Sequence, residues 1–505
     1  METLDNTEWD VVISGTGLPQ SLLALALSRS GKKVLHIDHN DYYGGDEAAF
    51  SLTEAEGWAR KHSNSTSEQS VFSKAAVRTL EVNDAVKSKL GTPRAYSFAL
   101  APQLIYTRSN LLQALVSSRT HSQLDFQAVG SWFAVVNDQN DPDAAPRLIR
   151  VPSGREDVFR DATLDLRAKR SLMRFIRFVG SYDEDGEREK WVQFREQPVH
   201  SCLRDQFSLP DAAIEALLAL ALPPYANIEP TMATVVPRVR QHLQSIGVFG
   251  AGFAAVLPKW GGLAEIAQVA CRACAVGGGV YVLGKGITNA TKSEVGVTLE
   301  LSPGEKIKTQ WLVGCSKDLP TSGSYTSDLK DNSGAIAKRV AVISSPLTSL
   351  FPPTSEGGPL PAGAVVVAKS ATSPRATVQI LAHSSESGEC PTGQCVLYAT
   401  STGSDGLDVI DEAISSLLRS IGEEPVPDIL WRMDYVQTSH DQSDNGLSVD
   451  GPIVTLPSLS IDAVYEDKLL NSTKEVWQMI TGGSEGAFMK FEPREGIDED
   501  EADDG

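Results

Sequence analysis

Two glycines, at positions 15 and 17 of the stretch VVISGTGLPQSLLALALSRSGKKVLHID, have the spacing of a turn that binds a dinucleotide. That chemistry uses three glycines: one makes a tight turn, one lets the backbone approach a pyrophosphate, and one lets the helix pack closely on the strand. Gly15 and Gly17 meet the first two needs, but the third position is Gln20. Asp38 ends the next apolar stretch, where an acid would accept hydrogen bonds from a ribose. The pattern therefore predicts the fold of a dinucleotide-binding unit more strongly than it predicts a bound dinucleotide.

Other residue types that carry chemistry are scattered along the chain. Cys271 and Cys274 have the spacing of redox pairs and zinc sites, but zinc needs two more ligands, and the other close pair is Cys390 with Cys395. The eight histidines form no His-Glu-x-x-His motif, and no Walker sequence occurs. We therefore predict no metal site and no catalytic residue.

The elements that position the glycine turn are readable on either side of it. An apolar strand over residues 10–13, a helix over 21–28 and a second strand over 32–38 follow one another in a βαβ order. Such strands are parallel and joined by a right-handed crossover. The fold class predicted is α/β, with a Rossmann-like domain of the FAD/NAD(P)-binding type, mixed sheets and an inserted all-helical domain.

The length of 505 residues exceeds what one hydrophobic core usually serves. We assign residues 1–151 and 231–490 to one large domain, residues 152–230 to the inserted helical domain, and residues 491–505 to an acidic disordered tail. The polar stretch 46–94 is predicted to be a flexible surface insertion. The helical domain contains an amphipathic helix near 170–180, whose apolar face has Leu172, Phe175, Ile176 and Val179.

Composition restricts the class of protein. Mean hydropathy is −0.15 and no apolar run approaches the length of a membrane span. A net charge of −20 argues against nucleic-acid binding, which needs concentrated Lys and Arg. The acidic start METLDNTEWD lacks the features of a signal peptide, and six irregularly spaced cysteines favour reduced thiols. We expect a cytoplasmic protein.

Two longer stretches resemble a known family. GKKVLHIDHNDYYGG resembles the N-terminal block of the superfamily of Rab GDP-dissociation inhibitors and Rab escort proteins, and GGLAEIAQVACRACAVGGGVYVLGK resembles its second block. The resemblance implies a flavin-monooxygenase-like fold that holds no flavin, so no cofactor is expected. It also implies a platform that binds GDP-bound Rab GTPases. The implied platform residues are Tyr43, Gly44, Gly45, Glu265, Gln268, Arg272 and Val282.

Spacing is consistent with that implication, because Glu265 and Arg272 are seven positions apart and share one face of a helix. The sequence departs from the family pattern in both blocks. His39 and Asp41 stand where the family has arginine and proline, and Ala267 and Val269 flank Gln268 where it has proline and glycine.

Further stretches resemble the escort branch of the superfamily, of fungal type: LIYTRSNLLQALVSS and VPSGREDVFRDATLDLRAKRSLMRFIRFV. This branch implies an accessory, non-catalytic component of Rab geranylgeranyltransferase. Such a component presents newly made Rab to the alpha/beta heterodimer and shields the geranylgeranyl lipid with its helical domain. It then delivers the lipidated Rab to membranes, with which it associates transiently. The branch has a similar Cys-x-x-Cys with no known metal.

Two alternatives remain open from the sequence. A Rab GDP-dissociation inhibitor would extract and recycle already lipidated Rabs. A flavin-dependent oxidoreductase would use the glycine turn for its original chemistry.

Overall fold

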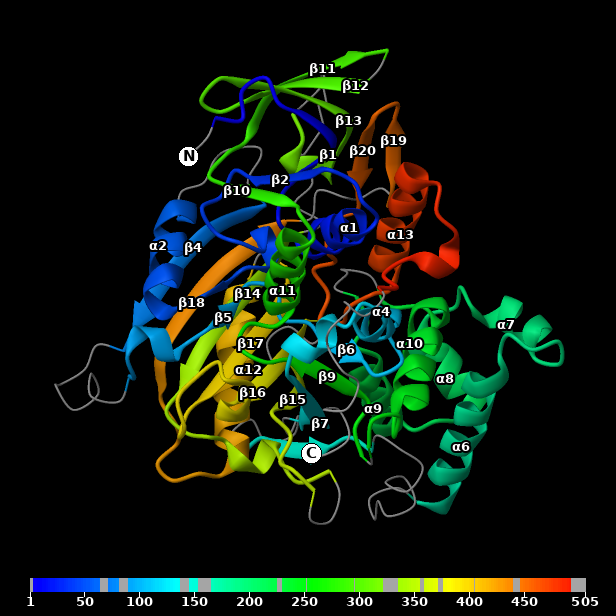
Figure 1. The fold of residues 1–505 in the computed structure, drawn as a ribbon. Helices are drawn as coiled ribbons and strands as arrows, with labels where there is room; N and C mark the ends of the chain where they lie inside the picture. The colour runs from blue at the N-terminus through cyan, green and yellow to red at the C-terminus, as the bar shows by residue number, and fades with distance from the viewer. Residues whose placement is uncertain are drawn as a thin grey trace, which may run out of the picture.

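The structure is a computed structural model, and two β-sheets form its centre (Figure 1). The residues that it describes are 3–63, 71–80, 90–136, 145–152, 165–224, 229–250, 252–294, 296–320, 335–354, 358–370, 376–403, 405–438 and 446–491. The predicted tail therefore lies outside the described residues, apart from residue 491.

The smaller sheet begins with the predicted βαβ unit. β1 (Glu8–Ser14) pairs in parallel with β2 (Val34–Asp38), and α1 (Leu18–Arg29) joins them, which confirms this prediction. β10 (Val280–Leu283) adds in parallel to β2, and β13 (Glu305–Cys315) adds in parallel to β1. The carboxyl ends of these parallel strands therefore meet at one edge, beside the start of α1.

Four further strands extend this sheet beyond β13. β12 (Gly296–Leu301) pairs antiparallel with the first half of β13, and β11 (Ile287–Ser293) pairs antiparallel with β12. β20 (Ile453–Leu456) pairs in parallel with its second half, and β19 (Ser448–Asp450) pairs with β20. Three helices pack together with α1 in one core: α4 (Asn110–Ser117), α11 (Leu263–Val276) and α13 (Lys468–Thr481). Every residue of α1 except Arg29 is buried.

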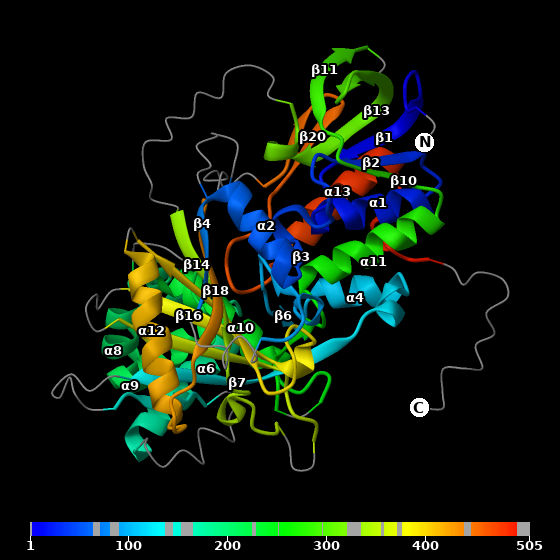
Figure 2. The ribbon, with the colours of Figure 1, turned by 90° about the vertical axis from the view of Figure 1, so that its left-hand side faces the viewer.

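The larger sheet has a mixed order of strands. It runs β4 (Phe72–Thr79), β18 (Ile429–Thr438), β14 (Ala335–Ile343), β17 (Cys395–Thr402), β16 (Thr377–Ser384), β15 (Gly363–Lys369), β7 (Phe126–Val136), β9 (Ala255–Pro258) and β6 (Ile105–Tyr106), with β8 (Arg147–Arg150) beside β7. The amphipathic helix α12 (Gly406–Ile421) covers one face (Figure 2). α2 (Leu52–His62) contributes to the core on the other face, and β3 (Ala49–Phe50) pairs with β5 (Phe98–Ala99) nearby.

The prediction of a flexible insertion over 46–94 is wrong for its described parts. α2 and β4 lie within this stretch, and β4 joins the edge of the larger sheet. Trp58 is 3% exposed and packs edge to face on Phe72 and Tyr435, with ring centroids 5.0 and 5.4 Å apart. A capping box of Ser51 and Glu54 starts α2. A few aromatic anchors thus order a stretch that is polar on average.

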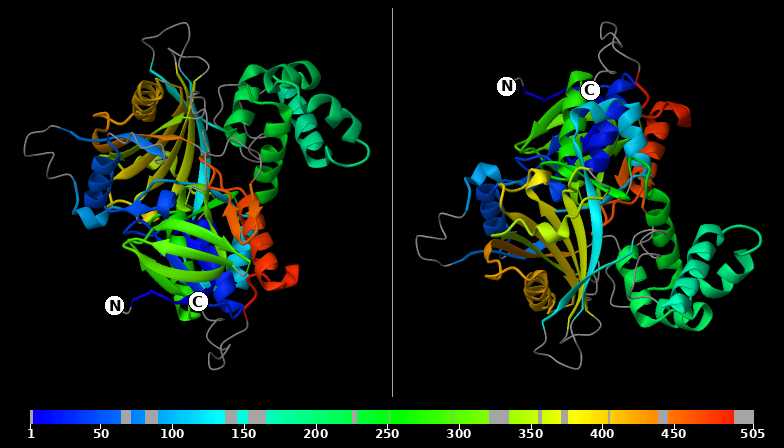
Figure 3. Two further views of the ribbon diagram at one scale, coloured as in Figure 1. Left: turned by 90° about the horizontal axis from the view of Figure 1, so that it is seen from above. Right: turned by 90° about the horizontal axis from the view of Figure 1, so that it is seen from below.

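Five helices form a separate group to one side of both sheets (Figure 3). They are α6 (Leu166–Ser181), α7 (Arg188–Phe194), α8 (Val199–Phe207), α9 (Asp211–Ala221) and α10 (Met232–Ser245). The predicted apolar face of α6 points into their shared core, where Phe175 is fully buried. Met232, Val236 and Val239 of α10 lie in the same core, although the predicted boundary at residue 230 assigns α10 to the large domain. In the described part of the chain, no helix is both long enough and apolar enough to span a membrane.

Candidate functional site

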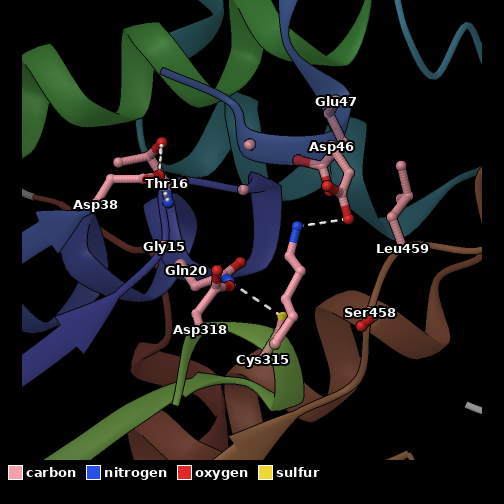
Figure 4. A pocket seen from close by; sticks show the side chains of 13 residues that line it. Gly15, Thr16, Gln20, Asp38, Asp46, Glu47, Cys315, Asp318, Ser458 and Leu459 are labelled. Carbon is pink, nitrogen blue, oxygen red and sulfur yellow. Dashed lines mark hydrogen bonds and ion pairs between the residues drawn. The ribbon is translucent and has the colours of Figure 1, made fainter. Parts of the chain in front are cut away.

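The edge where the parallel strands end has the layout of a dinucleotide site. Gly15 follows β1, Asp38 ends β2 and Asp318 follows β13, all next to the first turn of α1 (Figure 4). The turn after Tyr43 brings Glu47 to the same place. Only about 10 Å³ of free volume remains between these groups, which is room for about one water molecule.

Side chains lie against both glycines of the turn. Gly15 has a φ of +87°, and a Cβ added there would collide with the Asp318 carboxylate. A Cβ on Gly17 would stand 2.8 Å from Gln20 Oε1 and 3.2 Å from Glu47 Oε2. The glycines therefore allow close approach, as the fingerprint requires. The groups that approach them, however, are the carboxylates of Asp318 and Glu47 and the side-chain amide of Gln20.

Glu47 takes the position of an anion at the start of α1. Its Oε2 accepts a hydrogen bond from the Leu18 N–H at 2.5 Å, one of the amides that a helix N-terminus offers to a phosphate. Gln20, at the third position of the fingerprint, is 2% exposed and donates from Nε2 to Asp318 Oδ2 at 3.1 Å. Gln20 thus holds the Asp318 carboxylate in place over Gly15.

Burial controls the charge of this cluster. It raises the pKa of Glu47 to about 8 and that of Asp318 to about 7. Burial also acts to lower the pKa of Lys317, but the carboxylates of Asp46 and Asp318 outweigh it and raise that pKa. Lys317 Nζ lies 2.5 Å from Asp46 Oδ2. The residues present do not fit a dinucleotide, because its pyrophosphate would have to displace Glu47 and Asp318.

Asp38 has a different role from the one its position suggested. It is 1% exposed, and its Oδ2 accepts from the backbone N–H and the hydroxyl of Thr16 at 2.8 and 2.6 Å. Its Oδ1 accepts from the N–H and the side-chain amide of Asn40 at 2.8 and 3.0 Å. With four donors inside the chain, this carboxylate is not available to a ribose.

The Thr16 hydroxyl connects Asp38 to the turn that presents Tyr43. Its oxygen accepts a hydrogen bond from the Gly44 N–H at 3.0 Å while its proton goes to Asp38. Gly44 and Gly45 have φ values of +94° and +53°, in the left-handed region that favours glycine. Asp38 therefore fixes, through Thr16, the shape of the Tyr-Tyr-Gly-Gly turn.

The residues implied for the platform come from three neighbouring elements. The half-buried Tyr43 ring lies 6.3 Å from the ring of Tyr281 on β10, and Tyr281 packs on His36 of β2 at 4.6 Å. Burial lowers the pKa of His36 to about 4, so this ring is neutral near pH 7. Val282 follows on β10 and is half-buried.

α11 supplies the charged part. Glu265, Gln268 and Arg272 lie on its accessible side, and Arg272 Nη2 donates to Glu265 Oε1 at 3.0 Å. The helix begins at Leu263, after Gly262 with a φ of +61°, and continues through Ala267 and Val269, where the family has proline and glycine. Tyr281 links the two parts, since its hydroxyl faces the thiols of Cys271 and Cys274 on α11. All six cysteines are free, and burial raises the pKa of Cys271 to about 11.

Sequence reasoning missed the residues that close the glycine turn. Glu47, Lys317 and Asp318 were not singled out, although a signal for two of them existed. Lys317 and Asp318 follow the apolar strand WLVGC, and the carboxyl ends of parallel strands meet at one edge. No group of three His, Cys, Asp or Glu arranged for a metal ion occurs among the described residues.

Comparisons with known proteins agree with the predicted resemblance. A family model described as GDP dissociation inhibitor matches residues 5–361. The "Rab proteins geranylgeranyltransferase component A" of Saccharomyces cerevisiae is 28% identical over 473 residues, which are 92% of this chain and 71% of that protein. The protein of the same name from Candida albicans is 27% identical over 83% of this chain, and the match spans 64% of its own length. "Rab escort protein 1" of Arabidopsis thaliana is 25% identical over 99% of this chain and 98% of that protein.

Solved structures agree with the fold. The crystal structure of a Rab GDI from Plasmodium falciparum has a TM-score of 0.64 at 20% identity and covers 95% of this chain and 99% of its own. A putrescine oxidase has a TM-score of 0.55 at 12% identity and covers 95% and 100%. At these identities the likeness concerns the fold alone, and it confirms the prediction of a Rossmann-like fold of the FAD-binding type.

Proposed function

The chain belongs to the GDP dissociation inhibitor family, and on that premise we propose that it binds GDP-bound Rab GTPases and escorts them through geranylgeranylation. The observation that carries the proposal is the link from Asp38 through Thr16 to Gly44, because it turns a cofactor-binding edge into the support of a surface tyrosine. Tyr43 then stands beside the charged face of α11. Such a combination of a held aromatic ring with an exposed arginine is typical of protein interfaces.

The platform suits a protein partner better than a small molecule. The free volume at the glycine turn is about 10 Å³, whereas pockets for small molecules hold several hundred Å³. Arg272 is 61% exposed and Glu265 is 20% exposed, so both reach a partner that approaches from outside. Gln268 on α11 and Val282 on β10 are half-buried and add a polar and an apolar group.

We assign no catalytic residue and no cofactor to this function. Glu47 and Asp318 occupy the places of the pyrophosphate, and Asp38 is held by Thr16 and Asn40. The flavin-dependent oxidoreductase is therefore disfavoured. A preparation purified in the presence of added FAD should show no flavin absorbance after gel filtration, and a stoichiometric flavin spectrum would reverse this assignment.

The escort role is favoured over the role of an inhibitor by the extent of the likeness. The two fungal component A proteins and the plant escort protein align over 92%, 83% and 99% of the chain. "Guanosine nucleotide diphosphate dissociation inhibitor 1" of Arabidopsis thaliana is 26% identical over 67% of it, the same share as for the component A protein of Drosophila melanogaster. The separate helical group α6–α10 offers a place for the transferase heterodimer and for the geranylgeranyl chain. Cover for that chain matters, since each buried CH₂ contributes about 0.8 kcal/mol. An escort of this kind works in the cytoplasm and touches membranes only on delivery.

A reconstituted lipidation reaction tests the proposal. Purified transferase heterodimer, a Rab loaded with GDP and labelled geranylgeranyl diphosphate are combined with and without this chain. An escort makes label transfer dependent on the chain, and Tyr43→Ala with Arg272→Ala reduces it while Arg147→Ala, on exposed β8, does not. No transfer, together with extraction of lipidated Rab from membranes, would instead identify an inhibitor.

A further inference from the structure

A groove of about 640 Å³ opens beside the larger sheet, between the second half of α12 and the strands β18 and β4. Figure 2 shows α12 well apart from α11 and β10, so the groove is separate from the platform. α12 packs on the central strands from β14 to β7, and β4 lies at the edge of the sheet. In the part of the chain that the structure describes, α12 therefore leaves this face of β4 open, and Ala76 and Arg78 are exposed there.

Three arginines from three elements line this groove: Arg78 of β4, Arg432 of β18 and Arg419 of α12. Arg78 and Arg432 are direct partners in the antiparallel register, so their side chains leave the sheet on the same face. Like charges in this relation destabilise a strand pair. An anion between them would convert this repulsion into attraction.

The acids nearby are already in use. Arg432 Nη1 lies 2.6 Å from Asp411 Oδ1, and its Nε lies 3.6 Å from Asp434 Oδ2. Both acids also bind Arg339, which is 1% exposed and donates to Asp434 at 2.5 and 3.1 Å. Two arginines and two aspartates thus neutralise one another in this network.

Arg78 and Arg419 remain without an acid, since no ion pair of the described residues includes either of them. Asp428 is the one carboxylate among the lining residues, against the two arginines that lack an acid. The groove is therefore locally basic in a chain whose net charge is −20.

The rest of the lining is apolar and partly open to solvent. Leu80 is 39% exposed and Val426 is 48% exposed, and the more buried Leu418 and Ile429 also line the groove. Among the described residues, β4 pairs with β18 alone, so its outer edge offers backbone donors and acceptors to an extended chain. This combination differs from a site for a small anion, which needs little apolar surface.

We propose that this groove binds an extended acidic segment of a partner protein, with apolar side chains between its carboxylates. The carboxylates pair with Arg78 and Arg419, and the apolar side chains pack on Leu80 and Val426. Arginine suits this task because its planar donors bind carboxylates in pairs. A flat bilayer surface is disfavoured as the occupant, because the arginines line a groove between a helix and a strand edge, which admits an extended chain.

The test uses the full chain and a fluorescein-labelled peptide of the sequence Asp-Leu-Glu-Val-Glu-Leu-Asp, followed by fluorescence anisotropy. We expect saturable binding that weakens as salt is added. The double charge reversal Arg78→Glu with Arg419→Glu should weaken it at least tenfold. The matched control is Arg147→Glu with Arg150→Glu, which reverses two exposed arginines of β8 outside the groove and should leave binding unchanged.

Three results overturn the proposal: no saturable binding to the acidic peptide, equal weakening by both double variants, or equal binding of a Lys-Leu-Lys-Val-Lys-Leu-Lys peptide. A separate arm measures sedimentation with phosphatidylserine vesicles. If those vesicles bind through Arg78 and Arg419 while the peptide does not, the groove recognises a membrane and the peptide assignment is wrong.

Discussion

Arg272 donates to Glu265 across two turns of α11, with 3.0 Å between Nη2 and Oε1, so the two charges of the proposed platform are paired before any partner arrives. Arg272 is 61% exposed, and exposed ion pairs contribute about 0–1 kcal/mol to stability. We infer that the pair instead orients the guanidinium for the proposed partner.

The first prediction concerns Arg272→Ala. We expect the melting temperature to stay nearly unchanged while the Kd for GDP-bound Rab rises about tenfold or more, as for an interfacial arginine. Isothermal titration calorimetry measures the Kd, and Arg147→Ala on β8 is the control. A variant that unfolds early, or that binds Rab like the wild type, would remove Arg272 from the platform.

The second prediction concerns the contact between Gly15 and Asp318. Gly15→Ala should destabilise the chain by roughly 2–4 kcal/mol, because a left-handed backbone costs about 1–2 kcal/mol and the collision with the carboxylate adds to it. In the background of Asp318→Ala the collision is relieved and the backbone cost remains. Urea unfolding of the wild type, the two single variants and the double variant gives the coupling energy between positions 15 and 318. Equal costs of Gly15→Ala in both backgrounds would mean that Asp318 does not lie over the glycine.

The third prediction concerns pH. Glu47 has a pKa of about 8 in the folded chain because of burial, against an ordinary value of 4.5. Between these values the folded state holds a proton that the unfolded state has lost, so the free energy of unfolding falls as pH rises. None of this stability is lost below a pH of 4.5, and all of it is lost above a pH of about 8.

Glu47→Gln should remove this part of the pH dependence, since glutamine is neutral throughout and its oxygen still accepts from Leu18. Urea midpoints at about pH 5.5 and about pH 8.5 should therefore lie closer together in the variant than in the wild type. Glu475→Gln, at an exposed position of α13, is the control. Parallel curves for Glu47→Gln and the wild type would contradict the prediction.

Sequence was most informative where the structure is local. Apolar strands around Gly15 predicted the βαβ unit, and the spacing of Leu172, Phe175 and Val179 predicted the buried face of α6, because both patterns depend on residues a few positions apart. The closing of the glycine turn depends on Gln20 meeting Asp318, 298 positions away, through the parallel pairing of β1 with β13. No local pattern contains that contact.

The same limit explains the error over 46–94. Average polarity predicted a flexible segment, whereas burial of Trp58 against Phe72 and Tyr435 orders α2 and β4, and Tyr435 comes from a distant strand. Asp38 was located correctly at the end of β2, but its partners depend on how the Gly44 turn folds back on Thr16. The position of Asp38 on the sheet was predictable from the sequence, but the hydrogen bonds that its carboxylate accepts were not.

The fourth prediction separates the helical group from the platform. Phe175 is fully buried in the core of α6–α10, 5.1 Å from the ring of Phe207, so Phe175→Ala should cost about 3–5 kcal/mol within that group. We expect Rab binding to persist while chain-dependent lipidation is lost. Leu166→Ala, on the same helix and 75% exposed, should leave stability within about 0.5 kcal/mol. Loss of Rab binding together with lipidation would show that the two regions do not act separately.

The fifth prediction concerns the Thr16 hydroxyl, which donates to Asp38 and accepts from Gly44. Thr16→Val keeps the shape of the side chain but leaves the Gly44 N–H without its acceptor in a buried place, which should cost about 1–3 kcal/mol. Thr16→Ser keeps the hydroxyl and should restore most of this loss. If Asp38 supports the turn of Tyr43, the valine variant also weakens Rab binding, whereas the serine variant binds like the wild type.

Chemical unfolding and Rab titration on the same three chains separate the two consequences of Thr16→Val. A loss of stability in the valine variant with unchanged Rab binding would mean that Tyr43 keeps its position without the hydroxyl, and the support of the platform would then lie elsewhere. A loss of both stability and Rab binding that serine restores ties Asp38 to Rab recognition. Fluorescence of added FAD gives a third readout, since a dinucleotide site would respond to Asp38→Asn and the closed turn should not.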